Sequence, residues 1–180
     1  MSIRVKICGI TTEAGMDAAV AAGAEWVGLN FFPASPRHVT PARAAALAAR
    51  DIGFHVMGYF PITPSTEVAE NLSKMQADGT HDIRMIAADG EHGAAGICYG
   101  ASLAGGRVLN ATSSQGLLYA LEQLPVQAGT RVPMVLNLAA RAVSGPLDIR
   151  GDHSDLYYAL NTGWIVLCAG GIENSRMLLW

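Results

Sequence analysis

Short apolar runs alternate along the chain with alanine-rich runs whose apolar positions recur at helical spacing. The apolar runs are rich in β-branched residues and are bounded by glycine, proline or polar residues, which is typical of strands. The expected strands are residues 4–10, 26–32, 54–60, 83–87, 107–110, 132–139 and 164–168. The expected helices are residues 12–22, 41–50, 65–75, 91–104, 115–123 and 154–161. Thr11 or Thr12 is expected to cap the first helix and Thr40 the second, with Pro41 in its first turn.

This alternation predicts the α/β class, built of βαβ units with a mostly parallel sheet and helices on both faces. Because both halves of the chain alternate in this way, we expect them to share one sheet. Ligand sites in such sheets lie beyond the carboxyl ends of the strands. Four polar residues come just after expected strands, namely Thr63, Glu91, Thr112 and Arg141. We therefore expect these four residues to gather at one edge of the sheet.

Composition narrows the function classes. The 180 residues suit one domain or slightly more, and 51% of them are hydrophobic, which is ample for a core. Only 15% are charged, which favours a surface partly covered by a partner and is compatible with a homo-oligomer. The formal charge of -3 gives no basic excess for binding nucleic acid. No secretory leader and no apolar run of membrane-spanning length is evident, so we expect a cytoplasmic protein without membrane contact.

The three cysteines, Cys8, Cys98 and Cys168, are widely separated and form no CxxC pair. We therefore expect no metal site and no iron–sulfur cluster held by this chain alone. Cys8 ends a strand beside Lys6, so it is either an activated thiolate or a small buried apolar residue.

Residues 1–50 carry the segments KICGIT at 6–11 and FFPASPRHV at 31–39. They resemble the start of phosphoribosylanthranilate isomerase, a (β/α)8-barrel enzyme of tryptophan biosynthesis. The resemblance implies that Cys8 is a general base and that Arg37 lies near the substrate. That barrel needs about 250 residues and an aspartate acid, for which the chain after Ala140 offers no counterpart. An isomerase-like function is thus the alternative reading, and we expect no isomerase turnover.

Residues 54–168 carry a second series of motifs. These are GYFPITPSTE at 58–67, EHGAAG at 91–96, ATSSQGL at 111–117, RAVSGPLDI at 141–149 and GDHSD at 151–155. In order and spacing they resemble the pyrimidine-side thiamine-diphosphate domain of 2-oxoacid:ferredoxin oxidoreductases, which decarboxylate pyruvate and related acids. The joint resemblance divides the chain into an isomerase-like part (1–50), a thiamine-diphosphate domain (51–168) and an unassigned tail (169–180), so the chain looks chimeric.

The resemblance implies roles for six residues. Glu91 would activate the aminopyrimidine, Arg141 would bind the carboxylate of the 2-oxo acid, and Thr63 would hydrogen-bond substrate or cofactor. Thr112, Ser114 and Gln115 would border the cofactor. Five of these residues also have an ordinary interpretation: Glu91 as a first-turn glutamate, Arg141 as a surface arginine, Thr63 as a helix cap, and Ser114 and Gln115 as residues that cap the next helix. Asp152 and His153 are interpreted as turn residues.

The same resemblance implies partners. In that family a second domain holds the diphosphate and its magnesium ion through a GDG-type motif, and this chain has Gly151-Asp152-His153 instead. The iron–sulfur clusters that pass electrons to ferredoxin would also lie on partner subunits or domains. The expected function is therefore an incomplete part of a pyruvate-type oxidoreductase. A folded α/β chimera without catalysis is the second alternative.

Overall fold

The computed structural model describes residues 4–168 of the chain. The elements, in chain order, are β1 (Lys6–Cys8), α1 (Glu13–Ala21), β2 (Trp26–Gly28), α2 (Pro41–Ile52), β3 (Val56–Tyr59), α3 (Thr66–Ala77), β4 (Arg84–Ala87), α4 (Glu91–Leu103), β5 (Val108–Thr112), α5 (Ser114–Ala120), α6 (Gln123–Thr130), β6 (Met134–Leu138) and α7 (Ser154–Ala159). Alternating strands and helices confirm the predicted α/β class. The tail 169–180, including its AGGI segment, lies outside the described residues.

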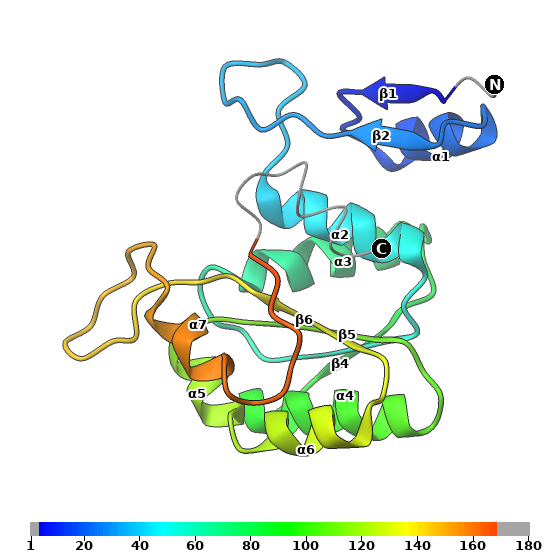
Figure 1. Cartoon of the computed structure of the whole chain (residues 1–180). Helices are drawn as coiled ribbons and strands as arrows, with labels where there is room; N and C mark the ends of the chain where they lie inside the picture. The colour runs from blue at the N-terminus through cyan, green and yellow to red at the C-terminus, as the bar shows by residue number, and fades with distance from the viewer. Residues whose placement is uncertain (1–3, 169–180) are drawn as a thin grey trace.

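All strand pairs are parallel, but they form two sheets rather than one. The four-stranded sheet has the order β4-β3-β5-β6, and β1 pairs only with β2. Figure 1 shows α2 and α3 between the two sheets, with α4, α5 and α6 on the opposite face of the larger one. The expectation of one shared sheet is therefore wrong. A layer of helices separates the two groups of strands, so their backbones cannot pair.

The helix boundaries in the first third of the chain follow the predicted signals. The Thr12 hydroxyl accepts a hydrogen bond from the Gly15 N–H, and the Thr40 hydroxyl accepts one from the Arg43 N–H, both at 3.1 Å. Pro41 occupies the first turn of α2, where its missing N–H costs nothing. The helix ends at Gly53, which adopts a left-handed conformation with φ +69°.

One apolar core joins the two sheets through the helices between them. Met16 of α1, Val27 of β2, Leu47 of α2 and Leu72 of α3 belong to the same buried cluster as Met57 of β3. A smaller cluster on the other side of the large sheet contains Leu117, Leu124 and Ala159, with Trp164 packed against it. Within residues 4–168, no helix combines the length and the apolar character that a membrane span requires.

Helix α4 packs unusually close to β3. A Cβ on Gly58 would lie 2.6 Å from the Ala94 carbonyl oxygen and 3.1 Å from the Cys98 sulfur. The Cys98 sulfur accepts a hydrogen bond from the Gly58 N–H at 3.3 Å. Burial raises the pKa of the Cys98 thiol to about 11, so this cysteine is a packing residue rather than a nucleophile. Cys8, by contrast, is exposed, so its interpretation as a buried apolar residue is wrong.

One further prediction fails near the end of the chain. Residues 164–168 form no strand: the Trp164 indole donates to the Leu124 carbonyl at 3.0 Å, while Ile165 next to it is 86% exposed. Packing of Trp164 on the small apolar cluster thus holds the chain away from the sheet. The expected helix 115–123 is present as α5, which ends at Ala120, and a separate helix α6 that the sequence did not predict follows it. Helix α6 contains Pro125 and Gly129, two residue types that usually argue against a helix. A proline in the first turn is nevertheless compatible with a helix.

The close approach of α4 to β3 predicts that Gly58 tolerates no side chain. We expect Gly58→Ala to destabilise the protein by about 1–3 kcal/mol, because overpacking forces the helix away from the sheet. Gly100→Ala is the control. Gly100 lies in α4, the helix that packs on β3, and a Cβ there would meet nothing within 4 Å. This substitution should stabilise the protein by up to about 1 kcal/mol. Urea unfolding measures both changes, and equal midpoints for Gly58→Ala and the parent would contradict the packing argument.

Candidate functional site

The carboxyl ends of the parallel strands β3, β5 and β6 carry the candidate site. Thr112 is the last residue of β5, while Thr63 and Arg141 follow β3 and β6 within a few residues. Glu91 is the first residue of α4, in the connection after β4. The structure brings these residues together in two groups, Glu91 with Thr112 and Thr63 with Arg141, joined through the first turn of α5.

Glu91 and Thr112 meet above Gly116. A Cβ on Gly116 would lie 2.5 Å from the Thr112 hydroxyl oxygen and 2.8 Å from Glu91 Oε1. The absence of a side chain at Gly116 is therefore what admits both groups. Thr112 is only 3% exposed, and its hydroxyl has no hydrogen-bond partner among the described residues. A buried hydroxyl without a hydrogen-bond partner costs free energy. A further polar group that reached the Thr112 hydroxyl would therefore be stabilised there.

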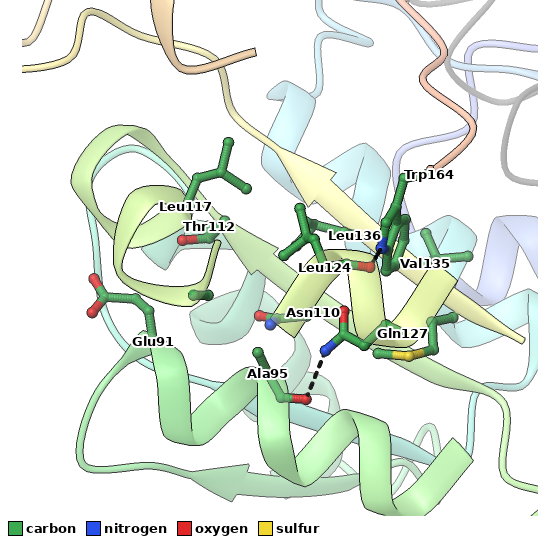
Figure 2. A pocket seen from close by; sticks show the side chains of 12 residues that line it. Glu91, Ala95, Asn110, Thr112, Leu117, Leu124, Gln127, Val135, Leu136 and Trp164 are labelled. Atoms are coloured by element: carbon green, nitrogen blue, oxygen red, sulfur yellow. Dashed lines mark hydrogen bonds between the residues drawn. The ribbon is translucent and has the colours of Figure 1, made fainter. Parts of the chain in front are cut away.

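Glu91, Thr112 and Gly116 form a small niche, and a cavity of about 10 Å³ lies behind it. Figure 2 shows Glu91 at one end of the cavity lining and Trp164 at the other, with the Glu91 carboxylate pointing away from the other lining residues. Gln127 closes one wall by donating to the Ala95 carbonyl at 3.4 Å. The cavity holds about one water molecule. A heterocyclic ring cannot enter it, so a ring that contacts Glu91 must approach from outside.

Arg141 is buried, with 7% of its surface exposed, so its interpretation as a surface arginine is wrong. Its Nε donates to the Thr63 carbonyl at 2.8 Å, and its Nη1 donates to the Asp148 carbonyl at 3.0 Å. Nη1 also approaches the Ser144 hydroxyl at 3.5 Å. No hydrogen bond in residues 4–168 involves Nη2, so its two hydrogens have no acceptor among these residues. A bidentate contact with a carboxylate through both terminal nitrogens would use one of the two Nη1 hydrogens, which lie near Asp148 and Ser144.

The Thr63 side chain is exposed and its carbonyl serves Arg141. Ser65, not Thr63, occupies the N-cap of α3, and its hydroxyl donates to the Ile62 carbonyl at 2.8 Å. The interpretation of Thr63 as the helix cap is therefore wrong. Its hydroxyl remains accessible beside the anchored guanidinium of Arg141.

The first turn of α5 ties two distant loops together. Ser113 is the N-cap, but its hydroxyl donates to the Ala139 carbonyl at 2.6 Å instead of capping the helix. Ser114 donates from its hydroxyl to the Ala142 carbonyl at 2.7 Å and also contacts the Gln115 side-chain oxygen. The Gln115 amide donates to the Ser144 carbonyl at 2.9 Å. These side chains hold the loop after β6 in place, which the interpretation as helix caps did not anticipate.

Asp155 is a site residue that sequence reasoning missed. It is fully buried, and its Oδ2 accepts hydrogen bonds from the N–H groups of Ser114 at 2.8 Å and Arg141 at 3.1 Å. The one signal in the sequence was an aspartate at the second position of an expected helix, and first-turn acids are common. Its neighbour Asp152 is exposed and accepts from the Ser154 N–H, as expected of a turn residue. Asp148 is also a surface group, and its hydrogen bonds with Arg150 lower its pKa to about 2.

Cys8 and Arg37 form a separate group on the two-stranded sheet. Cys8 ends β1, and the Arg37 side chain lies over Gly9, 2.7 Å from the position of a Cβ there. Gly9 has φ +82°, so a side chain at that position would be strained as well as blocked. None of the hydrogen bonds described above connects this pair to Glu91 or Arg141. Residues 4–168 contain no cluster of three metal-ligating side chains.

Comparison with known proteins places most of the chain in one family. A sequence model of the family described as "Pyruvate flavodoxin/ferredoxin oxidoreductase, thiamine diP-bdg" matches residues 47–178. The pyruvate synthase subunit PorA of Thermotoga maritima is 40% identical over 131 residues, covering 73% of this chain and 33% of the relative. The PorA subunit of Pyrococcus furiosus is 42% identical over 136 residues, covering 76% of this chain and 34% of the relative. The ketoisovalerate oxidoreductase subunit VorA of Pyrococcus horikoshii is 39% identical over 133 residues, covering 74% and 33%.

The chain thus spans about a third of the length of these relatives. Among solved structures, the 2-oxoglutarate:ferredoxin oxidoreductase of Magnetococcus marinus matches with a TM-score of 0.53 and 24% identity, covering 75% of this chain and 23% of that one. This likeness supports the fold. Phosphoribosylanthranilate isomerase of Thermotoga maritima gives a TM-score of only 0.27, which carries no argument. The family match begins at residue 47, so the isomerase-like reading of residues 1–50 stays a prediction.

The niche above Gly116 predicts that an added methyl group displaces Glu91. We expect Gly116→Ala to cost about 1–3 kcal/mol of stability, because its Cβ would overlap both Thr112 and Glu91. The matched control is Gly129→Ala in α6, where a Cβ meets nothing within 4 Å and stability should not fall. Thermal unfolding and a crystal structure of the variant test this. If the Glu91 carboxylate kept its position in Gly116→Ala, the claim that Gly116 leaves the space for Glu91 would be wrong.

Proposed function

Because the chain belongs to the pyruvate flavodoxin/ferredoxin oxidoreductase family of thiamine diphosphate-binding domains, we propose that it forms the part of a 2-oxoacid:ferredoxin oxidoreductase subunit that binds the aminopyrimidine ring of thiamine diphosphate. One observation carries the proposal. The Glu91 carboxylate lies above Gly116, beside the buried and unpartnered hydroxyl of Thr112, at the carboxyl end of a parallel sheet.

The residues of this niche suit a flat nitrogen heterocycle. A carboxylate at its rim would bind a ring nitrogen, and the glycine below leaves the space that Glu91 and the Thr112 hydroxyl occupy. Glu91 is the group that would hydrogen-bond the far nitrogen of the aminopyrimidine and hold a proton there. When bound, thiamine diphosphate supplies an electron sink for decarboxylation. Thr112 would border the site beside Glu91 with its hydroxyl buried, whereas Ser114 and Gln115 would support the site from behind, since their polar atoms already hold the loop after β6.

The proposed substrate is a 2-oxo acid, whose carboxylate Arg141 and Thr63 would bind. Arg141 retains Nη2 for this purpose, and its other contacts fix the guanidinium next to the exposed Thr63 side chain. A guanidinium that is already held loses little rotational freedom on binding. Two relatives are named pyruvate synthase subunits and a third a ketoisovalerate oxidoreductase subunit, so pyruvate is the substrate to test first.

The proposal requires partners. About two-thirds of the length of each relative lies outside the match, which leaves room there for domains that hold the diphosphate with magnesium. Iron–sulfur subunits or domains would then pass electrons to ferredoxin. Apolar side chains next to the candidate site support contact with another protein surface: Leu147 is 85% exposed, Ile149 67% and Tyr157 68%. A ring held by Glu91 from outside would be sheltered by such a partner.

Glu91→Gln tests the aminopyrimidine role. The variant keeps the shape of the side chain but loses the charge that favours the activating tautomer, so cofactor activation should slow on the order of 100-fold. The measurement is exchange of the thiazolium C2 proton by NMR, in the chain combined with a diphosphate-binding domain and magnesium. Glu67→Gln is the matched control, since Glu67 is also a first-turn glutamate but lies exposed on α3. Equal exchange rates for Glu91→Gln and the parent would reduce Glu91 to an ordinary first-turn glutamate.

Arg141→Lys tests the substrate role. Lysine keeps the positive charge but lacks the planar fork, and it cannot reach Thr63 and Asp148 together while binding an anion. We expect the KM for pyruvate to rise roughly tenfold or more, with a smaller effect on C2-proton exchange. Arg150→Lys is the control from the same loop, because Arg150 is exposed and pairs with Asp148 at the surface. Pyruvate kinetics that are alike in Arg141→Lys and Arg150→Lys would exclude this role.

A further inference from the structure

Asp155 receives three backbone hydrogen bonds in the buried space between α5 and α7. Its Oδ2 accepts from Ser114 at 2.8 Å and from Arg141 at 3.1 Å, and its Oδ1 accepts from Leu156 at 2.7 Å. The residue is 0% exposed, so none of this charge is solvated by water. A buried carboxylate is tolerated only when such charge-assisted hydrogen bonds satisfy it. The three N–H groups are therefore held firmly, and two of them belong to loops of the candidate site.

The backbone conformation of Ser114 is consistent with a strong constraint from Asp155. Its φ is +44°, a left-handed conformation that a residue with a Cβ adopts only when its surroundings enforce it. Asp155 binds its N–H, and the Ala142 carbonyl binds its hydroxyl at 2.7 Å. The helix α5 begins at this residue, so the direction in which Gly116 presents its open face follows from the Ser114 conformation.

We infer that Asp155 is a positioning residue, which sets the placement of Glu91 relative to Arg141 through the backbone N–H groups of Ser114 and Arg141. This inference rests on the proposed function of those two residues. On one side, Asp155 fixes Ser114, which orients Gly116, against which Glu91 lies. On the other side, it fixes the backbone of Arg141, whose side chain reaches Thr63. One carboxylate thus joins both halves of the site.

The residue type matters because all three neighbours are donors. An ionised carboxylate offers acceptors on both oxygens, whereas asparagine places an NH2 group on one side. In Asp155→Asn that NH2 faces either Leu156 or the pair formed by Ser114 and Arg141, and in both cases two donors oppose each other. The substitution keeps the volume of the side chain and changes only the hydrogen bonding.

Asp155→Asn is compared with two controls from the same turn. Asp152→Asn alters an exposed aspartate, and Ser154→Ala removes a hydroxyl that accepts from the Val143 N–H at 2.9 Å without contacting Ser114 or Arg141. The purified chain is labelled with 15N, and NMR follows the amide signals of Ser114 and Arg141 and the Nε–H signal of Arg141. Pyruvate is then titrated as the probe. Should Asp155→Asn not fold, Asp155→Glu takes its place, since it keeps the charge but shifts it by one methylene.

We expect the Ser114 and Arg141 amide signals to move and to exchange faster in Asp155→Asn than in either control. The dissociation constant for pyruvate, read from the Arg141 Nε–H signal, should rise on the order of 10- to 100-fold, and stay within about twofold of the parent in the controls. Ser154→Ala separates positioning from general loosening of the loop. Unmoved amide signals, or parent-like pyruvate binding in a folded Asp155 variant, would overturn the inference. A parent Arg141 signal that does not respond to pyruvate would instead contradict the proposed substrate role, while the Ser114 and Arg141 amide signals would still decide the positioning role.

Discussion

A carboxylate that water cannot reach has to be satisfied by the protein, and Asp155 is satisfied by N–H groups from three segments. Ser114 lies 41 residues before it and Arg141 lies 14 residues before it. The turn after β5 and the loop after β6 can therefore move apart only by exposing a buried charge. The strained backbone of Ser114 and the buried guanidinium of Arg141 both depend on this constraint. Removing one partner of such a buried charge is far more costly than losing a surface contact.

Two glycines allow helices α4 and α5 to pack closely at the candidate site. At Gly58 the backbone of α4 approaches β3 so closely that a methyl group would meet the Ala94 carbonyl oxygen. This contact fixes the start of α4, where Glu91 lies. At Gly116 the first turn of α5 leaves the space that Glu91 and the Thr112 hydroxyl occupy. The position of the glutamate is thus set by backbone packing on two sides, which the role proposed for Glu91 would require.

The geometry also explains why a ligand at this site would be shared with another surface. The cavity behind Glu91 has room for about one water molecule, so a ring can only lie against the open edge of the niche. Arg141 is held by Thr63 and Asp148 and keeps one nitrogen for an anion. Exposed apolar residues lie on the loop after β6, which carries Arg141, and on α7. The arrangement resembles one wall of a site, consistent with relatives about three times the length of the matched segment.

The sequence by itself determined the alternation of strands and helices, the caps at Thr12 and Thr40, and the placement of Glu91, Thr112 and Arg141 after strands. Hydrophobic period and capping are local properties, and the carboxyl ends of parallel strands face the same way wherever the strands lie. Only the tertiary structure decided that two sheets form, that Trp164 packs against Leu124 instead of starting a strand, and that Asp155 is buried. An aspartate in a first helical turn looks alike in sequence whether it faces water or the interior. Its role came from partners 14 and 41 residues away, and no local pattern encodes such distances.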